Sequence, residues 1–340
     1  MLSFKKTYTL PFKHDIPNYS LVFLAQNSSL LIWLKYKKRQ LFIKLKHQKF
    51  LEISQILPSH KKILWINISA PSLGDSLMDL SSRVMLEDRS IDLFTDSKNV
   101  DLYKDDKIFR RVFKDENQVF DESYDLVIID SYSSRSIRIK SKIAYLTPFV
   151  GIFGYYNGPE VNRILFSFHR LNQLLGYIRN KNEIAEIARA SISISDFDQT
   201  IIQNLNLPIS FVAIAIGGEW DYRIYKKWSK VIKLLLTQDA NLKIVIVGSA
   251  NAVEIVSEIL ENFNNQNIFN CVAKFTFNQT AQIISQARLL LCCDGGLMHA
   301  ANAVGTPVVP LFSRLSSKMQ LTDSINNFSC LLYTSDAADE

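Results

Sequence analysis

The chain has 340 residues, of which 47% are hydrophobic and 21% are charged, and its formal net charge is +6. This composition excludes a disordered protein and provides enough apolar residues for the cores of two ordinary domains. The excess of positive charge suits anionic partners such as nucleotide sugars, anionic lipid surfaces or nucleic acid. No apolar run reaches membrane-spanning length, and the first residues lack the pattern of a signal peptide.

Residues 1–60 are predicted to form a basic N-terminal extension or small subdomain. Lysine and arginine gather between Lys35 and Lys49, next to the apolar run Leu30–Leu34, and the alternation in Gln40–Leu45 predicts a short strand. A basic surface of this kind could dock on anionic lipid, and a solvated basic face is the simpler alternative.

Residues 61–195 are predicted to form an N-terminal Rossmann-like domain, because strand and helix patterns alternate along this stretch. The expected strands are Lys61–Ile68, Ile91–Thr95, Ile108–Phe113, Asp125–Asp130 and Ile143–Leu146. The expected helices are Ser76–Leu86, Val161–Ile178 and, in the connection to the next domain, Glu183–Ala190.

Residues 208–329 are predicted to form a second Rossmann-like domain. Its expected strands are Phe211–Ile216, Lys243–Val247, Leu289–Cys293 and Val308–Phe312. Its expected helices are Tyr225–Gln238, Ala252–Phe263, Asn278–Ala287 and Leu297–Val304. The fold class is therefore α/β, with two parallel-sheet domains facing a cleft.

An anion site is predicted where a glycine pair opens a helix. Asp294, Gly295 and Gly296 follow an apolar strand directly and precede the small residues of the next helix. Free backbone N–H groups and the positive end of the helix dipole meet at such a point, and the usual ligand is phosphate. His299 lies in the first turn and can reach the same ligand. A plain strand-to-helix turn is the alternative, because a glycine pair alone is a weak signal.

The stretch Leu289–Phe312 resembles the signature of glycosyltransferase family 9, the heptosyltransferase family. That signature is D-[TS]-G-x-x-H, a helix of small residues, G-x-P and an apolar strand. The matching positions are Asp294, Gly296, His299, Gly305 and Pro307. Gly295 replaces the hydroxyl residue and Met298 replaces a common Ser or Thr, which removes side-chain hydroxyls but leaves backbone N–H donation.

The loop after the first strand of the first domain, Ser69–Asp75, resembles the family's S-x-x-G-D pattern. In the family this aspartate is the general base that takes the proton from the acceptor hydroxyl. The resemblance thus implies Asp75 as base, with Ser72 and Gly74 in the loop on the acceptor side. An N-cap aspartate is the structural alternative, because aspartate is common at that position.

The family also has a strand, a glycine-containing loop and a K-x-W sequence that opens a helix. Gly217, Lys226 and Trp228 match this pattern. The resemblance implies that Lys226 reaches the diphosphate of the donor and stabilises the leaving group. Trp228 is expected to be a packing residue, and the neighbouring cations Arg223 and Lys227 are expected to be ordinary surface residues.

Glu254 follows a strand that ends at Val247 and lies at the start of a helix. A carboxylate at such a place often binds the hydroxyl groups of a nucleotide ribose, and a solvated helix glutamate is the alternative. Cysteine and histidine spacing shows no metal-ligand cluster, so neither a metal nor a cofactor is expected.

The resemblance implies a GT-B glycosyltransferase that inverts the anomeric centre. The sugar, heptose by family, would pass from a nucleotide-diphosphate donor, ADP by family, to a lipopolysaccharide core or related glycan. Asp75 would be the base, and the N–H groups from Gly295 to Leu297 would hold the diphosphate beside Lys226 and His299. We expect a cytoplasmic protein in peripheral contact with the inner membrane, without a nucleic-acid partner. A non-catalytic nucleotide-sugar-binding protein and a membrane-surface scaffold using the basic N-terminal segment are the alternatives.

The last segment, residues 330–340, resembles the in-frame translation of a transposon-based sequencing adapter. On this interpretation the natural chain continues beyond Ser329, and the second domain is truncated here. A genuine polar tail is the alternative.

Overall fold

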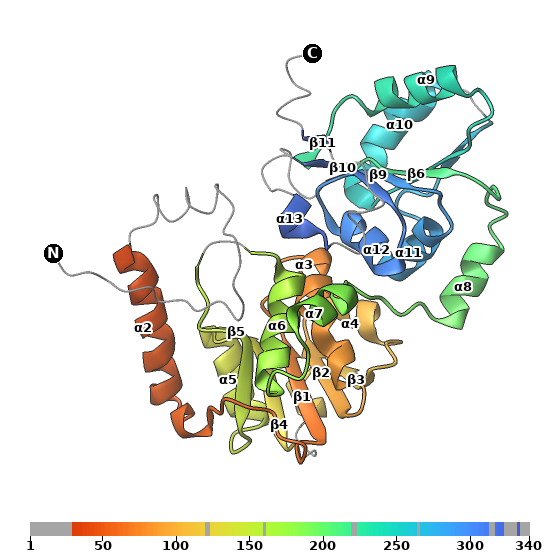
Figure 1. The fold of residues 1–340 in the computed structure, drawn as a ribbon. Coiled ribbons are helices and arrows are strands. Elements are labelled where there is room, and N and C mark those ends of the chain that lie inside the picture. The colour runs from red at the N-terminus through yellow and green to blue at the C-terminus, as the bar shows by residue number, and fades with distance from the viewer. Residues whose placement is uncertain are drawn as a thin grey trace. The chain divides into compact units, whose positions relative to one another are not determined.

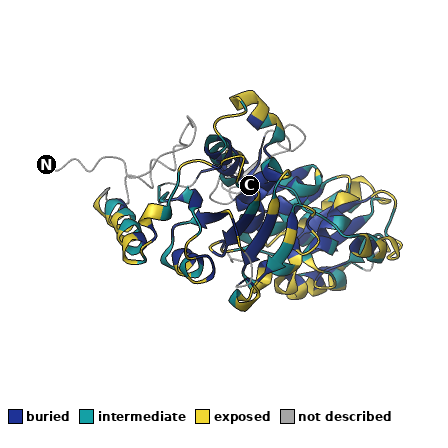
Figure 2. Ribbon diagram, turned by 90° about the horizontal axis from the view of Figure 1, so that it is seen from below, coloured by how far each residue is buried: buried dark blue, intermediate teal, exposed yellow. Residues whose placement is uncertain are grey.

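The computed structural model describes residues 29–119, 123–158, 161–218, 223–263, 266–312, 317–322 and 332–333. The chain divides into two compact units, Met1–Ala188 and Arg189–Glu340. Each unit is built on one parallel sheet with helices around it (Figure 1). The predicted α/β class with two Rossmann-like sheets is confirmed, and the cleft stays a prediction. In Figure 2 the strands are buried while the helices expose their outer faces.

The sheet of the first unit has the strand order β3-β2-β1-β4-β5. Its strands are β1 (Lys62–Asn67), β2 (Ser90–Thr95), β3 (Phe109–Phe113), β4 (Leu126–Ser131) and β5 (Phe149–Gly154). Apolar runs make these strands, because a parallel sheet is covered on both faces. The chain reverses its direction of winding between β1 and β4, so the topological switch point lies at the carboxyl ends of these two strands.

The helices of the first unit include three that the sequence did not indicate. In chain order the helices are α2 (Ser29–Leu45), α3 (Leu73–Asp79), α4 (Ser97–Tyr103), α5 (Ser134–Ile143), α6 (Arg163–Leu174) and α7 (Lys181–Ile187), with single turns at Lys49–Leu51, Ser81–Leu86 and Glu116–Gln118. The three additional helices are α2, α4 and α5. The strand predicted at Ile143–Leu146 is wrong: Ile143 ends α5, and the strand begins after Pro148. Proline can stand at the start of a strand, and the carbonyl of Pro148 accepts the first ladder bond from the N–H of Val127.

The strand predicted at Gln40–Leu45 is also wrong, because this stretch is the last part of α2. Ile32, Arg39 and Ile43 recur at helical spacing and face the first unit. The alternation covers only six residues, within a longer segment of good helix formers without glycine or proline. Ile43 is fully buried in the same core as Leu64 of β1, so the described part of the N-terminal segment packs on the first sheet.

The sheet of the second unit has the strand order β11-β10-β9-β6-β7-β8. Its strands are β6 (Val212–Ala215), β7 (Ile244–Val247), β8 (Ile268–Asn270), β9 (Leu290–Cys293), β10 (Val308–Phe312) and β11 (Leu332–Tyr333). Its helices are α8 (Asp196–Gln203), α9 (Trp228–Gln238), α10 (Val253–Asn262), α11 (Phe277–Ser285), α12 (Gly296–Val304) and α13 (Ser317–Gln320), with a single turn at Ala250–Ala252. The four predicted strands and four predicted helices are confirmed, and α8, α13, β8 and β11 are additional. The switch point lies between β6 and β9.

In the second unit, the end of α12 and the pairing of the edge strand β11 are both defined. Gly305 ends α12 in the left-handed conformation (φ 77°), and the N–H of Thr306 bonds back to the carbonyl of Ala301 at 3.0 Å, as the Gly-Thr-Pro sequence predicts. β11, within residues 330–340, pairs in parallel with β10.

Across the described ranges, every helix is too short or too polar to cross a bilayer.

Candidate functional site

The glycine pair opens α12 at the carboxyl end of β9, as the sequence predicts. Asp294 is buried, and its backbone N–H bonds to the carbonyl of Leu311 at 3.2 Å. Gly295 is the N-cap in an extended conformation, and its carbonyl accepts a bond from the N–H of Met298. The N–H groups of Gly296 and Leu297 have no acceptor in the described part of the chain. They are therefore available to an anion at the positive end of the helix.

Two contacts join the loop after β6 to this turn. The Nε of Arg223 lies 3.8 Å from Oδ2 of Asp294, and the backbone N–H of Tyr225 donates to the thiol sulfur of Cys293. The sequence predicts Arg223 to be an ordinary surface cation. In the structure it is instead the ion-pair partner of Asp294. Burial raises the pKa of Cys293 to about 11, so this thiol is neutral at physiological pH. The loops of two predicted motifs meet at the switch point.

Lys226 lies in the turn just before α9 and is exposed. The helix begins at Trp228, three residues later than predicted, and this tryptophan is buried with its ring edge-on to Tyr225 at 5.4 Å. The expectation that Trp228 packs is confirmed. Because Trp228 anchors the start of α9, Lys226 is kept on the surface near the carboxyl edge of the sheet, and its contact with a phosphate stays a prediction.

The loop after β7 packs against the glycines that follow β6. Asn251 donates to the carbonyl of Gly218 at 2.8 Å and accepts from the Ser249 hydroxyl at 2.8 Å. A Cβ at Gly217 would lie 2.8 Å from Oδ1 of Asn251, so any larger residue there would displace the Asn251 side chain. The structure thus gives Gly217 a packing function. Sequence reasoning did not identify Asn251, although it stands in the loop after an apolar strand, where site residues gather.

Two other predicted donor residues differ in their surroundings. His299 is buried one turn into α12, on the helix that carries the free N–H groups. Glu254 is the second residue of α10 and is exposed, without a hydrogen bond to any described residue. Its contact with a ribose stays a prediction.

In the first unit, Asp75 lies in the first turn of α3. Ser72 is the N-cap: its hydroxyl accepts the N–H of Asp75 at 3.2 Å and donates to Oδ2 of the same residue at 2.7 Å. The N-cap alternative for Asp75 is therefore wrong, because Asp75 is the third helical residue. Its Oδ1 has no hydrogen-bond partner among the described residues. Gly74 is buried between them in the same turn.

Two further carboxylates lie behind Asp75. Asp79, one helical turn on, receives two bonds from the guanidinium of Arg163, at 2.7 and 2.6 Å. Asp130, at the end of β4, accepts bonds from Trp65 at 2.9 Å and from Asn67 at 2.5 Å. Burial raises the pKa of both carboxyl groups, and Arg163 lowers that of Asp79. Asp130 could have been found from the sequence, because it ends an apolar strand at the edge where Asp75 lies.

The loop that carries Ser72 is held in place by two cations. The ammonium of Lys98 donates to the carbonyls of Ala70 and Pro71 at 2.9 and 2.6 Å, and the guanidinium of Arg135 donates to Ile68 at 3.0 Å. These bonds satisfy the carbonyls of an irregular segment and fix the start of α3. Asp75 is thereby positioned on a rigid element.

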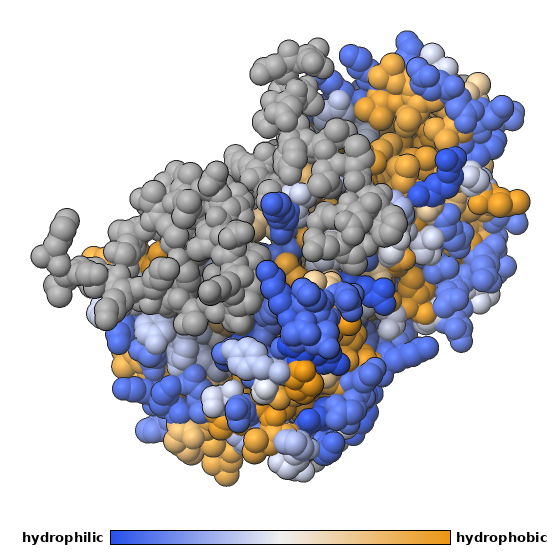
Figure 3. Space-filling view, in the orientation of Figure 1, coloured by the Kyte–Doolittle hydropathy of each residue, from blue (hydrophilic) through white to orange (hydrophobic). Residues whose placement is uncertain are grey.

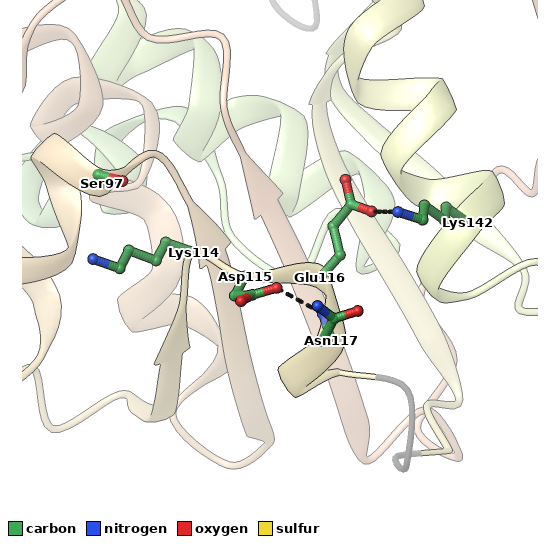
Figure 4. A pocket seen from close by; sticks show the side chains of 6 residues that line it. All are labelled: Ser97, Lys114, Asp115, Glu116, Asn117 and Lys142. Atoms are coloured by element: carbon green, nitrogen blue, oxygen red, sulfur yellow. Dashed lines mark hydrogen bonds and ion pairs between the residues drawn. The ribbon is translucent and has the colours of Figure 1, made fainter.

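A shallow pocket of about 490 Å³ lies elsewhere in the first unit (Figure 4). Its lining residues are Ser97, Lys114, Asp115, Glu116, Asn117 and Lys142. Figure 4 shows Glu116 paired with Lys142, and Asp115 turned toward the backbone of Asn117. None of the predicted site residues lines it. Over the described ranges, no three His, Cys, Asp or Glu side chains form a group that could hold a metal.

Two Rossmann-like units, each on a parallel sheet, are the architecture of the GT-B class of glycosyltransferases. Residues 167–332 match the family model of glycosyltransferase family 9 (heptosyltransferase).

Solved structures agree with this fold. The family 9 glycosyl transferase from Veillonella parvula DSM 2008 has a TM-score of 0.67 at 15% identity, covering 83% of this chain and 89% of that one. The E. coli ADP-heptose lps heptosyltransferase II has a TM-score of 0.63 at 17% identity, covering 80% and 90%. The E. coli heptosyltransferase WaaC with ADP has a TM-score of 0.59 at 14% identity, covering 80% and 93%. No curated protein sequence matches the chain.

Proposed function

We propose that this glycosyltransferase transfers heptose from ADP-heptose to a lipopolysaccharide core or related glycan, with inversion at the anomeric carbon. The observation that supports the proposal most is the junction of the loops after β6 and β9. There the free N–H groups of Gly296 and Leu297 lie on the loop that also pairs Asp294 with Arg223. Amide groups and cations at a helix start fit a diphosphate. The solved structure of WaaC with ADP supports adenosine as the nucleoside.

The base in this proposal is Asp75. Its Oδ1 takes the proton of an acceptor hydroxyl while the oxygen of that hydroxyl attacks the anomeric carbon. The bond from this carbon to the diphosphate breaks, and ADP leaves as an anion. A single displacement of this kind inverts the anomeric configuration. Ser72 holds the other carboxylate oxygen at 2.7 Å, which aims Oδ1 and keeps it free for the proton.

The donor side stabilises the charge that grows on the diphosphate. The N–H groups of Gly296 and Leu297 supply two oriented donors, and Lys226 supplies a mobile cation from the neighbouring loop. Such groups lower the barrier because they meet charge that develops in the transition state. His299 contributes from the same helix. We place the reaction at the cytoplasmic face of the inner membrane, where a nucleotide sugar can meet a glycolipid acceptor.

A transfer assay with product analysis tests this proposal. The chain is incubated with ADP-heptose and a lipopolysaccharide core acceptor, ADP release is measured, and the new linkage is assigned by NMR. We expect one ADP for each sugar transferred and a linkage opposite in configuration to the donor. Retained configuration would contradict the single displacement, and a folded protein that transfers no sugar would contradict the assignment of donor and acceptor.

A further inference from the structure

The helix α2 has one face that is fully engaged by its own unit. Ile32 and Ile43 are buried, and the guanidinium of Arg39 donates to the carbonyls of Gly154 and Tyr156 at 3.2 and 2.7 Å. Asn157 donates to the carbonyl of Ile32 at 2.8 Å. This face needs no other partner.

The opposite face of α2 carries a stripe of solvent-exposed leucines. It consists of Leu30, Leu34, Leu41 and Leu45, whose exposed fractions are 43, 47, 57 and 65% in that order. At 100° per residue they fall within about 60° of one another, roughly half a turn from Ile43. The stripe spans about 22 Å along the helix at 1.5 Å per residue. Exposed leucines that share one face of a helix mark an interaction surface rather than scattered exposure.

Lysines flank this leucine stripe on both sides. Lys37 and Lys44 lie along one edge, Lys35 and Lys38 along the other, and all four are exposed. The helix contains no aspartate or glutamate, and its single arginine faces inward. The aliphatic part of a lysine side chain can extend from such positions away from the leucines. The leucines can then enter the acyl-chain region of a lipid layer while the ammonium groups stay among anionic headgroups.

Hydrophobic residues continue past the end of α2. Phe50 is 71% exposed and Leu146 is 74% exposed. A hydrogen bond of 3.3 Å from Gln48 to the carbonyl of Tyr145 joins the segments that carry them. Figure 3 shows hydrophobic atoms gathered at the lower left of this face, around the C-terminal end of α2.

We propose that α2 lies flat on an anionic lipid surface, with the leucine stripe inserted and the lysines on the headgroups. Charge decides between this occupant and a second copy of the chain. Two copies meeting at the stripe would bring eight lysines together, whereas anionic headgroups neutralise them. The helix is not long and apolar enough to span the bilayer, and neither is any other described helix, so it would lie along the surface. This inference is independent of the donor and of the base.

Vesicle flotation tests the proposal with the full chain and no substrate. The probes are vesicles of phosphatidylcholine with about one third phosphatidylglycerol, and vesicles of phosphatidylcholine alone. We expect flotation with the anionic vesicles and much less with the neutral ones. The double variant Leu34→Ser/Leu41→Ser should lower the partition coefficient at least ~tenfold, because two inserted leucines are lost. Lys35→Gln/Lys38→Gln/Lys44→Gln should lower it about tenfold or more and flatten its salt dependence.

Matched controls lie on α9 of the second unit. Leu234 is 55% exposed and Lys230 and Lys233 are exposed, so Leu234→Ser and Lys230→Gln/Lys233→Gln remove one leucine and two lysines from another surface. These controls should float like the unaltered chain, and thermal melts should show that every variant is folded. Stripe variants that bind vesicles as well as the controls would overturn the proposal. So would sedimentation that shows a dimer lost in Leu34→Ser/Leu41→Ser, with no vesicle binding by the unaltered chain.

Discussion

Arg223 and Asp294, which stand far apart in the sequence, form an ion pair with 3.8 Å between Nε and Oδ2. The pair ties the loop after β6 to the family motif at the start of α12. The side chain of Asp294 is almost fully buried, while that of Arg223 is about one quarter exposed. The pair therefore places a cation on the loop next to the turn whose N–H groups the donor diphosphate would use.

Arg223→Gln should weaken ADP binding about five- to thirtyfold, because one charge-assisted contact is lost at the anion site. Calorimetric titration with ADP measures this change. Lys230→Gln removes an exposed cation from the neighbouring helix and should leave ADP binding unchanged. Equal affinities for the two variants would show that Arg223 only supports Asp294.

Asp75→Asn should lower the rate of transfer by about two to four orders of magnitude, because the amide cannot take the acceptor proton. Ser72→Ala should have a smaller effect, about tenfold, since it frees the carboxylate without removing it. Initial rates at saturating donor measure both, and calorimetry should show unaltered ADP binding. Asp101→Asn changes an exposed aspartate of α4 and serves as the control. Transfer by Asp75→Asn at the rate of this control would exclude Asp75 as the base.

Arg163→Met should destabilise the first unit by about 2–4 kcal/mol at neutral pH, because it leaves the buried carboxylate of Asp79 without its partner. The deficit should shrink in acid. The pKa of folded Asp79 already lies above its usual value, chiefly through burial, and loses its lowering by Arg163 in the variant. The folded state then binds a proton that the unfolded state has released, so stability falls as pH rises through this range.

Urea denaturation at pH 4.5 and 7 measures this deficit. Adding Asp79→Asn to Arg163→Met should recover part of the loss at pH 7, because no buried charge remains. Arg138→Met, at an exposed position on α5, is the control. A loss of stability that is independent of pH would count against an electrostatic origin. So would a double variant with a lower free energy of unfolding than Arg163→Met.

Lys140 is buried under the C-terminal turn of α2, where its ammonium donates to the side chain of Gln48 and to the carbonyl of Tyr145 at 3.1 Å. Burial lowers its pKa from 10.5 to about 7. Between these values the unfolded chain binds a proton that the folded chain lacks, so this lysine makes the free energy of unfolding rise with pH, by up to ~1.4 kcal/mol per unit.

Lys140→Met removes this dependence. The free energy of unfolding of Lys140→Met minus that of the unaltered chain should therefore be larger at pH 7 than at pH 9.5. Lys142→Met changes an exposed lysine of the same helix and should follow the unaltered chain at both values. Parallel pH profiles for Lys140→Met and the unaltered chain would show that Lys140 is not held neutral.

The sequence predicted most of the second sheet because its strands are short apolar runs with clear ends. β10 occupies the predicted residues, and α12 begins one residue before the predicted start, since Gly295 and the Gly305-Thr306-Pro307 stop mark both ends of that helix. β5 was missed because Gly151 and Gly154 interrupt its apolar run. α2 was misread because apolar residues on two opposite faces leave it with no single amphipathic pattern.

The candidate site was predictable only where local chemistry defines it. The glycine pair and Asp75 each follow a strand within a few residues, so their places at a sheet edge follow from the sequence. The partners of these residues do not, because Arg223 reaches Asp294 and Arg163 reaches Asp79 only through the fold. Sequence order carries no sign of such pairs.

The donor site is the central claim, and calorimetric titration of ADP, UDP and GDP tests it most directly. Lys226→Ala is compared with Lys227→Ala, since both lysines are exposed in the same turn before α9. We predict that ADP binds most tightly, that Lys226→Ala weakens it about tenfold or more, and that Lys227→Ala leaves it nearly unchanged. Equal effects of the two substitutions, or no binding of any diphosphate to the folded chain, would contradict the assignment.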